Sequence, residues 1–283
     1  MYPKALQYFY DFLDLIFSLV RMLWITRFVK TPAFAKHSKQ CLVMANGPSL
    51  HTSMQKLPGK LADYDLVAVN FMGMSEEFVL YKPSVYILCD PAFWFNAGTS
   101  ATQDKVRELY RHLIVHTSWD LQLYFPWQAE RVVEIQNLQN ENRHIRLQFY
   151  NKTKFEGLAF LKHPVYSRQW GMPRAQNVMA AALMLAVYSD YEQIYLAGAD
   201  NDWVKNLWVD EENRLRISNR HFYTEEGTRE DRIIPIRIHE QFAALYHTFK
   251  TYVDINLFAK RRGVKIINLT PLSYIDAFKK TEA

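Results

Sequence analysis

A polar turn follows the first strongly apolar run of the sequence, residues 41–45, and reads Asn46-Gly47-Pro48-Ser49. Gly47 permits the backbone to approach another group closely, and Pro48 suits the first turn of a helix. The Ser49 hydroxyl can bond the free N–H groups at such a helix start. A helix that begins where a parallel strand ends is a common binding position for phosphates. The turn therefore predicts either an anion site or an ordinary structural corner.

Two further apolar runs, residues 66–70 and 85–90, also end in polar side chains, Asn70 and Asp90. The carboxyl ends of parallel strands lie at one edge of a sheet, and open α/β folds bind their ligands outside that edge. Asn46, Asn70 and Asp90 together therefore predict a cradle for a nucleotide-sugar.

Short apolar runs that alternate with helical patterns extend over most of the chain. The clearest helical patterns cover residues 175–188 and 238–262. This alternation predicts an α/β, Rossmann-like domain with a mostly parallel sheet and helices on both faces. The expected strands are residues 41–45, 66–70, 85–90, 112–116, 145–150, 194–198 and 264–269.

Residues 201–237 interrupt this alternation, because they show little apolar periodicity and mix several arginines with acidic residues. A long irregular insertion in a compact domain is usually a functional loop or a disordered segment. We expect a lid over the active site. The expected domain organisation is thus an N-terminal segment, residues 1–35, and a catalytic domain, residues 36–283, that carries the lid.

Composition limits the classes of function. The chain has 283 residues, of which 49% are hydrophobic and 22% charged, as in an ordinary globular protein. A net charge of +5 suits an acidic ligand or an anionic membrane surface. No basic run with interleaved aromatic residues indicates a nucleic-acid groove. Cys41 and Cys89 lie in apolar runs, which favours a reducing compartment and excludes a cysteine-based zinc cluster.

Residues 4–29 are strongly apolar, but charged residues interrupt them too often for a membrane span of about 20 residues. The polar residues recur every three or four positions and so form one narrow stripe on a helix. We expect an amphipathic helix that lies in a membrane interface, with Arg27 and Lys30 near the lipid headgroups. The alternative is a helix buried against a partner subunit or against the body of this chain. The stripe consists of Lys4, Gln7, Asp11, Asp14, Ser18 and Arg21.

The order of these motifs resembles that of the family 42 bacterial sialyltransferases. The sequence NGPSL follows an apolar strand at residues 46–50, the next strand ends in Asn70, and another ends in Asp90-Pro91. Arg174-Ala175-Gln176-Asn177 then opens an alanine-rich helix. Residues 191–200, YEQIYLAGAD, are similar to the YKEIYLxGxD strand of that family, and a strand at 264–269 completes the order. The resemblance covers roughly residues 40–278.

The resemblance implies a set of donor-binding residues. Asn46 and Asn70 would contact the donor nucleotide or its phosphate, and Asp90, which is Asn in the family, would meet the sugar or the acceptor. Arg174 and Asn177 would lie near the carboxylate of the donor sugar. The role of the family's lid tyrosines would pass to Tyr223, His221 or a lid arginine. The full implied set is Asn46, Gly47, Ser49, Asn70, Asp90, Arg174, Gln176, Asn177, Asp200 and Tyr223.

The family's general base is a histidine just before the penultimate helix, and His239 occupies that place in this sequence. The chemistry needs such a group, because the acceptor hydroxyl must lose its proton while it attacks the anomeric carbon. His247, two turns further along, is the second candidate for the base.

The resemblance therefore implies a glycosyltransferase that moves sialic acid or another 2-keto acid sugar from a CMP donor to a glycan or lipid-linked acceptor. It would act in bacterial surface polysaccharide synthesis, as a peripheral protein on the cytoplasmic face of the inner membrane, and could form a homo-oligomer. No metal or other cofactor is expected.

Two other enzymes stay open. Asp200-Asn201-Asp202 has the spacing of a DxD motif, in which two carboxylates hold Mn²⁺ or Mg²⁺ against the diphosphate of a UDP-sugar. A pterin pyrophosphokinase-like enzyme, which would use ATP and metal, shares some of the same motifs.

Overall fold

The computed structural model describes residues 4–95, 97–219 and 230–280 of the chain. Its centre is an eight-stranded sheet with the order β11-β10-β6-β1-β2-β3-β4-β5, and every pair of neighbours in it is parallel. The predicted α/β class with a mostly parallel sheet is confirmed. The strands are β1 (Gln40–Met44), β2 (Asp65–Val69), β3 (Val85–Ile87), β4 (Leu121–Pro126), β5 (Ile145–Tyr150), β6 (Gln193–Ala197), β10 (Lys265–Asn268) and β11 (Lys279–Lys280).

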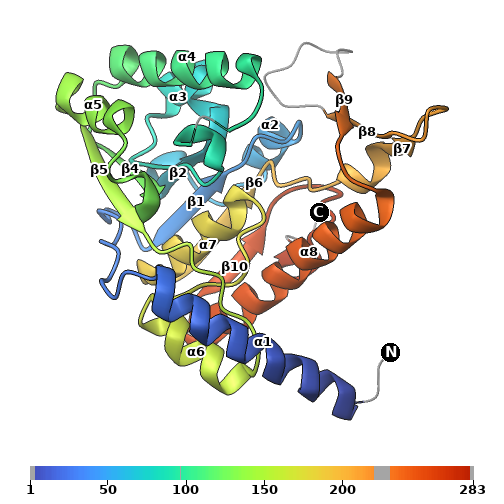
Figure 1. Cartoon of the computed structure of the whole chain (residues 1–283). Coiled ribbons are helices and arrows are strands. Elements are labelled where there is room, and N and C mark those ends of the chain that lie inside the picture. The colour runs from blue at the N-terminus through green and yellow to red at the C-terminus, as the bar shows by residue number, and fades with distance from the viewer. Residues whose placement is uncertain (1–3, 96, 220–229, 281–283) are drawn as a thin grey trace.

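Helices cover both faces of this sheet (Figure 1). Successive side chains of a strand point to opposite faces, so Val43 of β1 lies in one hydrophobic core while its neighbours Leu42 and Met44 lie in the other. Both faces of the sheet are buried, which explains why the strands are continuous apolar runs. One core contains residues of α1 (Lys4–Ile25), α6 (Ala159–Ser167), α7 (Val178–Tyr188) and α8 (Ile238–Arg261), and the other contains residues of α2 (Leu50–Met54), α3 (Glu76–Tyr81), α4 (Ser100–His116) and α5 (Val133–Glu141).

The predicted helix at 175–188 is α7, which is buried along its whole length. Such a helix is apolar on every side, and its many alanines let it lie close to the sheet. It begins later than predicted because Asn177 is the N-cap, where its Oδ1 accepts a hydrogen bond from the Ala180 N–H at 3.2 Å.

The predicted strand at residues 112–116 is wrong, because this segment is the last turn and a half of α4. A short apolar run does not by itself distinguish a strand from a buried helix turn. The spacing of the buried side chains Val106, Leu109 and Leu113 is helical and places them on one face of α4. The strand at this point of the sheet is β4, which the sequence analysis did not find.

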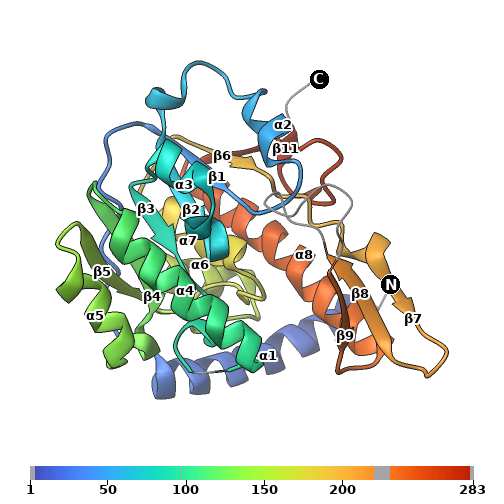
Figure 2. The same cartoon turned by 90° about the horizontal axis from the view of Figure 1, so that it is seen from above.

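The insertion at 201–237 is more regular than expected. Among its described residues it contains a short 3-10 helix, η5, and the three strands β7, β8 and β9, which form an antiparallel sheet beside the main sheet (Figure 2). Leu215 and Ile217 of β8 are buried while the intervening Arg216 is paired with Asp210 at 2.6 Å. These strands are short and rich in charge, which concealed them. The elements of the insertion are η5 (Trp203–Asn206), β7 (Leu207–Val209), β8 (Leu215–Asn219) and β9 (Glu230–Ile234).

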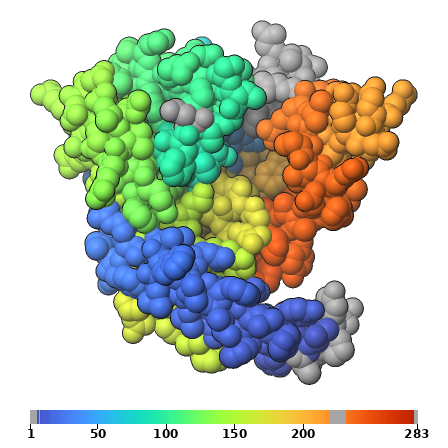
Figure 3. All heavy atoms as spheres, in the orientation of Figure 1, coloured from blue at the N-terminus to red at the C-terminus, as the bar shows by residue number. Residues whose placement is uncertain are grey.

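The N-terminal helix is confirmed as α1, which lies along one side of the molecule next to α6 (Figures 1 and 3). The chain that follows it is held against the body. The Phe34 side chain is buried, and the Phe34 backbone N–H donates to Ser189 Oγ at 3.0 Å. No helix among the described residues is both long enough and apolar enough to span a membrane.

Candidate functional site

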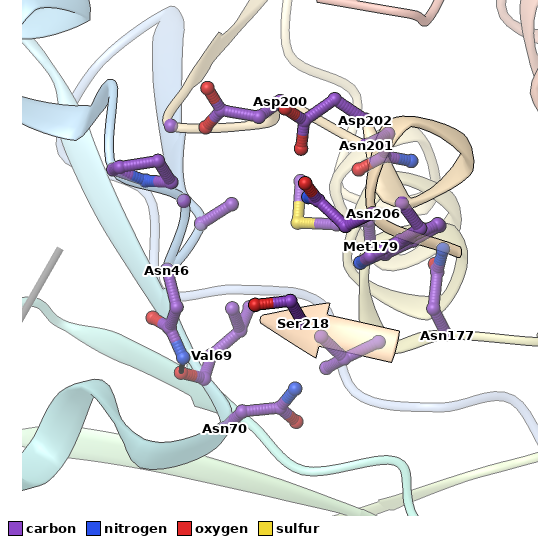
Figure 4. Close-up of a pocket in the computed structure, with 16 residues that line it drawn as sticks. Asn46, Val69, Asn70, Asn177, Met179, Asp200, Asn201, Asp202, Asn206 and Ser218 are labelled. Carbon is purple, nitrogen blue, oxygen red and sulfur yellow. Dashed lines mark hydrogen bonds between the residues drawn. The ribbon is translucent and has the colours of Figure 1, made fainter. Parts of the chain in front are cut away.

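A pocket of about 340 Å³ opens at the carboxyl edge of the sheet, above β1, β2 and β6 (Figure 4). The chain builds the sheet outward from β1 to β5 and then returns to place β6 on the other side of β1. The connections after β1 and β6 therefore leave in opposite directions, and open α/β folds bind ligands at such a switch point. The volume lies within the range of small-molecule sites. The residues that line it include Asn46, Gly47, Asn70, Asn177, Asp200, Asn201, Asp202, Trp203, Asn206 and Ser218.

The predicted turn and the end of β6 form one tight junction. The Gly47 N–H donates to the Gly198 carbonyl at 2.9 Å, and the Ser49 hydroxyl donates to Asp200 Oδ2 at 2.8 Å. A Cβ at Gly47 would lie far inside contact distance of both the Gly198 carbonyl oxygen and the Asp200 carboxylate. The close approach that Gly47 permits is thus to the chain itself. The Ser49 hydroxyl was expected to bond free N–H groups of the following helix, but it caps none of them, and the Ser49 N–H itself points at Asp200 Oδ2 at 3.5 Å.

Burial raises the pKa of Asp200 above its ordinary value, and the negative charge of Asp202 raises this pKa further. The two hydrogen bonds from Ser49 act in the opposite direction and lower it. The folded protein consequently holds this proton more tightly than the unfolded chain does. The stability that this proton contributes is complete below the ordinary pKa of 3.8 and is lost as the pH rises through the folded pKa.

Replacing Asp200 by Asn should therefore stabilise the ligand-free protein progressively as the pH rises. The amide oxygen can still accept from the Ser49 hydroxyl, but the variant has no charge to bury. Urea unfolding at pH 4 and at pH 7 measures the effect as the difference in unfolding free energy between variant and wild type. A difference that is the same at both pH values would show that the carboxylate carries no burial penalty.

Asn46 and Asn70 lie next to Val69 on the same side of the pocket (Figure 4). Asn46 Nδ2 donates to the Val69 carbonyl at 3.4 Å. The Oδ1 atoms of both residues are buried and have no hydrogen-bond partner within the described part of the chain. A buried amide oxygen without a partner is costly, so these two acceptors are suited to the N–H or O–H groups of a ligand. Asn70 also has a left-handed backbone, with φ of 49°.

The opposite wall depends on Tyr252 of α8, a residue that no motif of the sequence indicated. Asn177 Nδ2 and Asn201 Nδ2 both donate to the Tyr252 hydroxyl oxygen, at 2.9 and 2.7 Å. Burial raises the pKa of Tyr252 to about 12, so the phenol is neutral at physiological pH. It fixes both amides at the pocket wall. A buried tyrosine within an apolar helix face carries no signal of this role in a single sequence.

The insertion contributes Trp203, Asn206 and Ser218 to the same pocket. Ser218 Oγ is buried and without a partner among the described residues. The polar groups of the described lining are amides, hydroxyls and the two carboxylates Asp200 and Asp202, with no lysine or arginine among them. This chemistry suits the hydroxyls and base edges of a nucleoside. The insertion therefore lies beside the pocket, and its role as a lid stays a prediction.

The other predicted donor residues lie around the pocket or elsewhere. Gln176 lines a neighbouring hollow under β9 and α8. Asp90 is exposed and accepts from the Ala92 N–H at 2.8 Å, where it caps a short 3-10 helix, η3 (Pro91–Phe93). Arg174 is half-buried and does not line the pocket. Tyr223 and His221 lie outside the described residues.

The two candidate bases differ in their surroundings. His239 is exposed in the first turn of α8 and does not line the pocket. His247 is half-buried, and its Nδ1 has no partner in the described residues. Burial lowers the pKa of His247, and the positive charge of Arg174 lowers it further. Each role stays a prediction.

Three solved structures with related folds are glycosyltransferases. MAf glycosyltransferase from Magnetospirillum magneticum AMB-1 matches with a TM-score of 0.50 and 9% identity, over 93% of this chain but 37% of that one. The sialyltransferase CstII from Campylobacter jejuni, in complex with the substrate analogue CMP-3FNeuAc, matches with a TM-score of 0.44 and 13% identity, over 85% of each chain. An α2,3-sialyltransferase from Campylobacter jejuni in apo form gives 0.46 and 13%, over 88% of this chain and 82% of that one.

No protein-family model matches the sequence, and no curated protein matches it significantly. At these identities the likeness to solved structures concerns the fold. This chain spans only 37% of the length of the MAf glycosyltransferase. Membership of the sialyltransferase family stays a prediction.

Proposed function

We propose that this chain is a glycosyltransferase that takes a sugar from a CMP donor. The observation that carries the proposal is the pocket at the switch point of the sheet. The buried amide oxygens of Asn46 and Asn70 in this pocket accept no hydrogen bond from the described residues. The exocyclic amine of cytosine and the ribose hydroxyls offer hydrogen-bond donors to these oxygens. The sugar would be sialic acid or another 2-keto acid sugar, and the acceptor a glycan or lipid-linked glycan of a bacterial surface polysaccharide.

In this reaction a hydroxyl oxygen of the acceptor forms a bond to the anomeric carbon of the sugar, and the bond from that carbon to the phosphate oxygen breaks. The electron pair of the broken bond leaves with CMP, and the proton of the acceptor hydroxyl goes to a base. We assign the base to His239, which follows the insertion directly in the chain, with His247 as the second candidate.

CMP should stabilise the protein without added metal. A ligand that binds only the native state raises stability by RT ln(1 + [L]/Kd), so CMP at about 100 times its Kd should raise the Tm by on the order of 5 °C. Differential scanning fluorimetry in the presence of EDTA measures this shift.

Asn70→Gly is the informative variant, because glycine retains the left-handed backbone at this position while removing the amide. It should weaken CMP binding about tenfold through the loss of one hydrogen bond. Asn213→Gly is the matched control, since Asn213 also has a positive φ, of 58°, but is exposed in the turn between β7 and β8. An equal loss in both variants would count against a role of Asn70 in the pocket.

A metal-dependent UDP-sugar transferase is the second candidate, because Asp200 and Asp202 both line the pocket. In the described part of the chain, no cluster of three or more His, Cys, Asp or Glu residues could hold a metal. Carboxylates can nevertheless bind a cation together with a diphosphate. Stabilisation by UDP with Mn²⁺, and none by CMP, would favour this candidate. Stabilisation only by ATP with Mg²⁺ would favour the pyrophosphokinase.

A further inference from the structure

The helix α1 turns part of its polar stripe toward the body of the protein. Leu15, Ser18 and Met22 are buried, and Ser18 Oγ accepts a hydrogen bond from the Glu156 N–H at 2.9 Å. Arg21 Nη1 donates to the Lys154 carbonyl at 3.5 Å. A Cβ at Gly157 would lie 2.7 Å from the Asp11 carbonyl oxygen, so glycine lets α1 lie against the loop after β5. This loop therefore holds the helix by polar contacts.

The outward side of α1 is consequently apolar apart from the exposed Asp14, which reverses the ordinary arrangement of a surface helix. Trp24 is 87% exposed and Phe17 65%, and the exposed side chains cover more than half of the helix circumference. Figure 3 shows α1 lying open along its length at one side of the molecule. The exposed residues of this apolar face are Tyr8, Phe9, Tyr10, Phe12, Ile16, Phe17, Leu19, Val20, Leu23, Trp24 and Ile25, and Phe28 and Val29 extend it. A contiguous apolar surface of this kind marks an interaction site.

Exposed cations border this face. The Phe28 ring lies edge-on to the Trp170 ring at 5.3 Å, and the Arg168 guanidinium lies over the same Trp170 ring at 5.4 Å. Arg168 and Lys30 are both exposed. The end of the apolar face therefore carries positive charge where it meets α6.

At the other end of the face, a hollow of about 700 Å³ separates α1 from α6 and the end of α8. Its lining includes Tyr8 of α1, the exposed Phe160 of α6, and Arg261. The apolar surface thus continues from α1 onto α6, and a further exposed cation, Arg261, lies beside it.

We propose that the apolar face of α1, together with Phe160, docks in the plane of an anionic lipid bilayer. Aromatic side chains favour the membrane interface, and the rim of Lys30, Arg168 and Arg261 matches the negative charge of lipid headgroups. The face belongs to one projecting helix rather than to a flat surface, so lipid can surround it. A second copy of the chain would need a surface that also tolerates this positive rim.

Docking would orient the pocket relative to the membrane. The chain after α1 is tied to the carboxyl ends of β4 and β5, where the Arg27 N–H donates to Asn151 Oδ1 at 3.0 Å and its guanidinium pairs with Glu130 at 2.6 Å. The pocket opens at the same edge of the sheet. The bilayer would therefore lie near the open edge, as an acceptor held in lipid requires.

Co-sedimentation of the full chain with vesicles tests the proposal, with about three parts phosphatidylcholine to one part phosphatidylglycerol. The variant Phe17→Ser/Val20→Ser/Trp24→Ser changes three outward side chains of α1 and should bind at least about 100-fold more weakly. The matched control, Leu80→Ser/Val115→Ser/Val133→Ser, changes three side chains that are equally exposed on α3, α4 and α5, and should bind as the wild type does. Equal binding by both variants would overturn the proposal.

The charge of the rim is tested separately. Lys30→Gln/Arg168→Gln should weaken binding to the same vesicles about 25-fold, since each cation near the surface contributes about fivefold. Binding of the wild type to pure phosphatidylcholine vesicles should be weak. Indifference to both changes would overturn the anionic part of the proposal.

A third measurement separates lipid from a second copy of the chain. Brominated lipid should quench the fluorescence of the wild type, and less so that of Trp24→Phe, because Trp24 enters the bilayer. If the wild type does not bind vesicles and instead forms a dimer that the triple variant does not form, the second copy covers α1 and the proposal fails. None of these measurements involves a nucleotide, so their failure is distinct from failure of the proposed donor.

Discussion

Gly47→Ala should destabilise the protein by about 3 kcal/mol, the upper range for forcing an extra methyl into a well-packed region. The methyl group would occupy the space of the Asp200 carboxylate and of the Gly198 carbonyl, and the Asp200 Cγ would lie only 2.9 Å away. The ends of β1 and β6 would have to separate. Since both strand ends border the pocket, stabilisation by CMP should disappear as well. Urea unfolding gives the first quantity, and differential scanning fluorimetry with CMP the second.

Gly263→Ala is the control for this variant. Gly263 also needs a positive φ, of 73°, but a Cβ there would meet nothing within 4 Å. The control should cost about 1 kcal/mol for backbone strain alone and leave the response to CMP intact. Equal losses in the two variants would mean that the junction of β1 and β6 relaxes easily around a methyl group.

The position of this junction could be predicted from the sequence, but its internal contacts could not. Each strand end follows a continuous apolar run, and such runs identify buried parallel strands within a residue or so. The partner of Gly47, by contrast, is Asp200, which is more than 150 positions away in the chain. Only the order of the strands brings them together, so the local pattern left an anion site and a structural corner equally open and did not indicate the carboxylate that the chain places there.

The N-terminal helix shows the same division between local and tertiary information. The spacing of the polar residues predicted one stripe, and α1 has it. The direction of the stripe depends on the loop that contains Glu156 and Gly157, which receives Ser18 and the backbone near Asp11. Nothing local to residues 4–25 specifies that loop. Periodicity therefore identifies an amphipathic helix without telling which of its sides the protein covers.

The pocket was predicted best at the carboxyl ends of the strands next to the switch point. Asn46, Asn70 and Asp200 lie within three positions of the ends of β1, β2 and β6 and all line the pocket, whereas Asp90, three positions after β3, does not. Tyr252 and Ser218 do not lie at these strand ends, because α8 and the insertion bring them to the site by packing. The prediction of a strand at 112–116 was wrong for a related reason, since a short apolar run fits a helix face as well as a strand.

His239→Ala should lower the rate of sugar transfer by about two to four orders of magnitude, the usual contribution of a positioned general base. Binding of CMP should survive, because the imidazole would act on the acceptor hydroxyl and His239 does not line the pocket. Single-turnover transfer from a CMP-sugar, combined with calorimetric titration of CMP, separates the loss of chemistry from a loss of donor.

His247→Ala is the control, and a mild effect is expected if this side chain only packs within α8. The pH profile provides a second distinction between the two histidines. Burial and Arg174 lower the pKa of His247, so this imidazole stays neutral to a lower pH than the ordinary value of 6.5. If His247 were the base, the acid limb of the rate would lie below that value and would rise toward it when Arg174→Gln removes the positive charge. A large loss in His247→Ala, with this shift, would move the base two turns along α8. A small loss in both variants would place it outside α8.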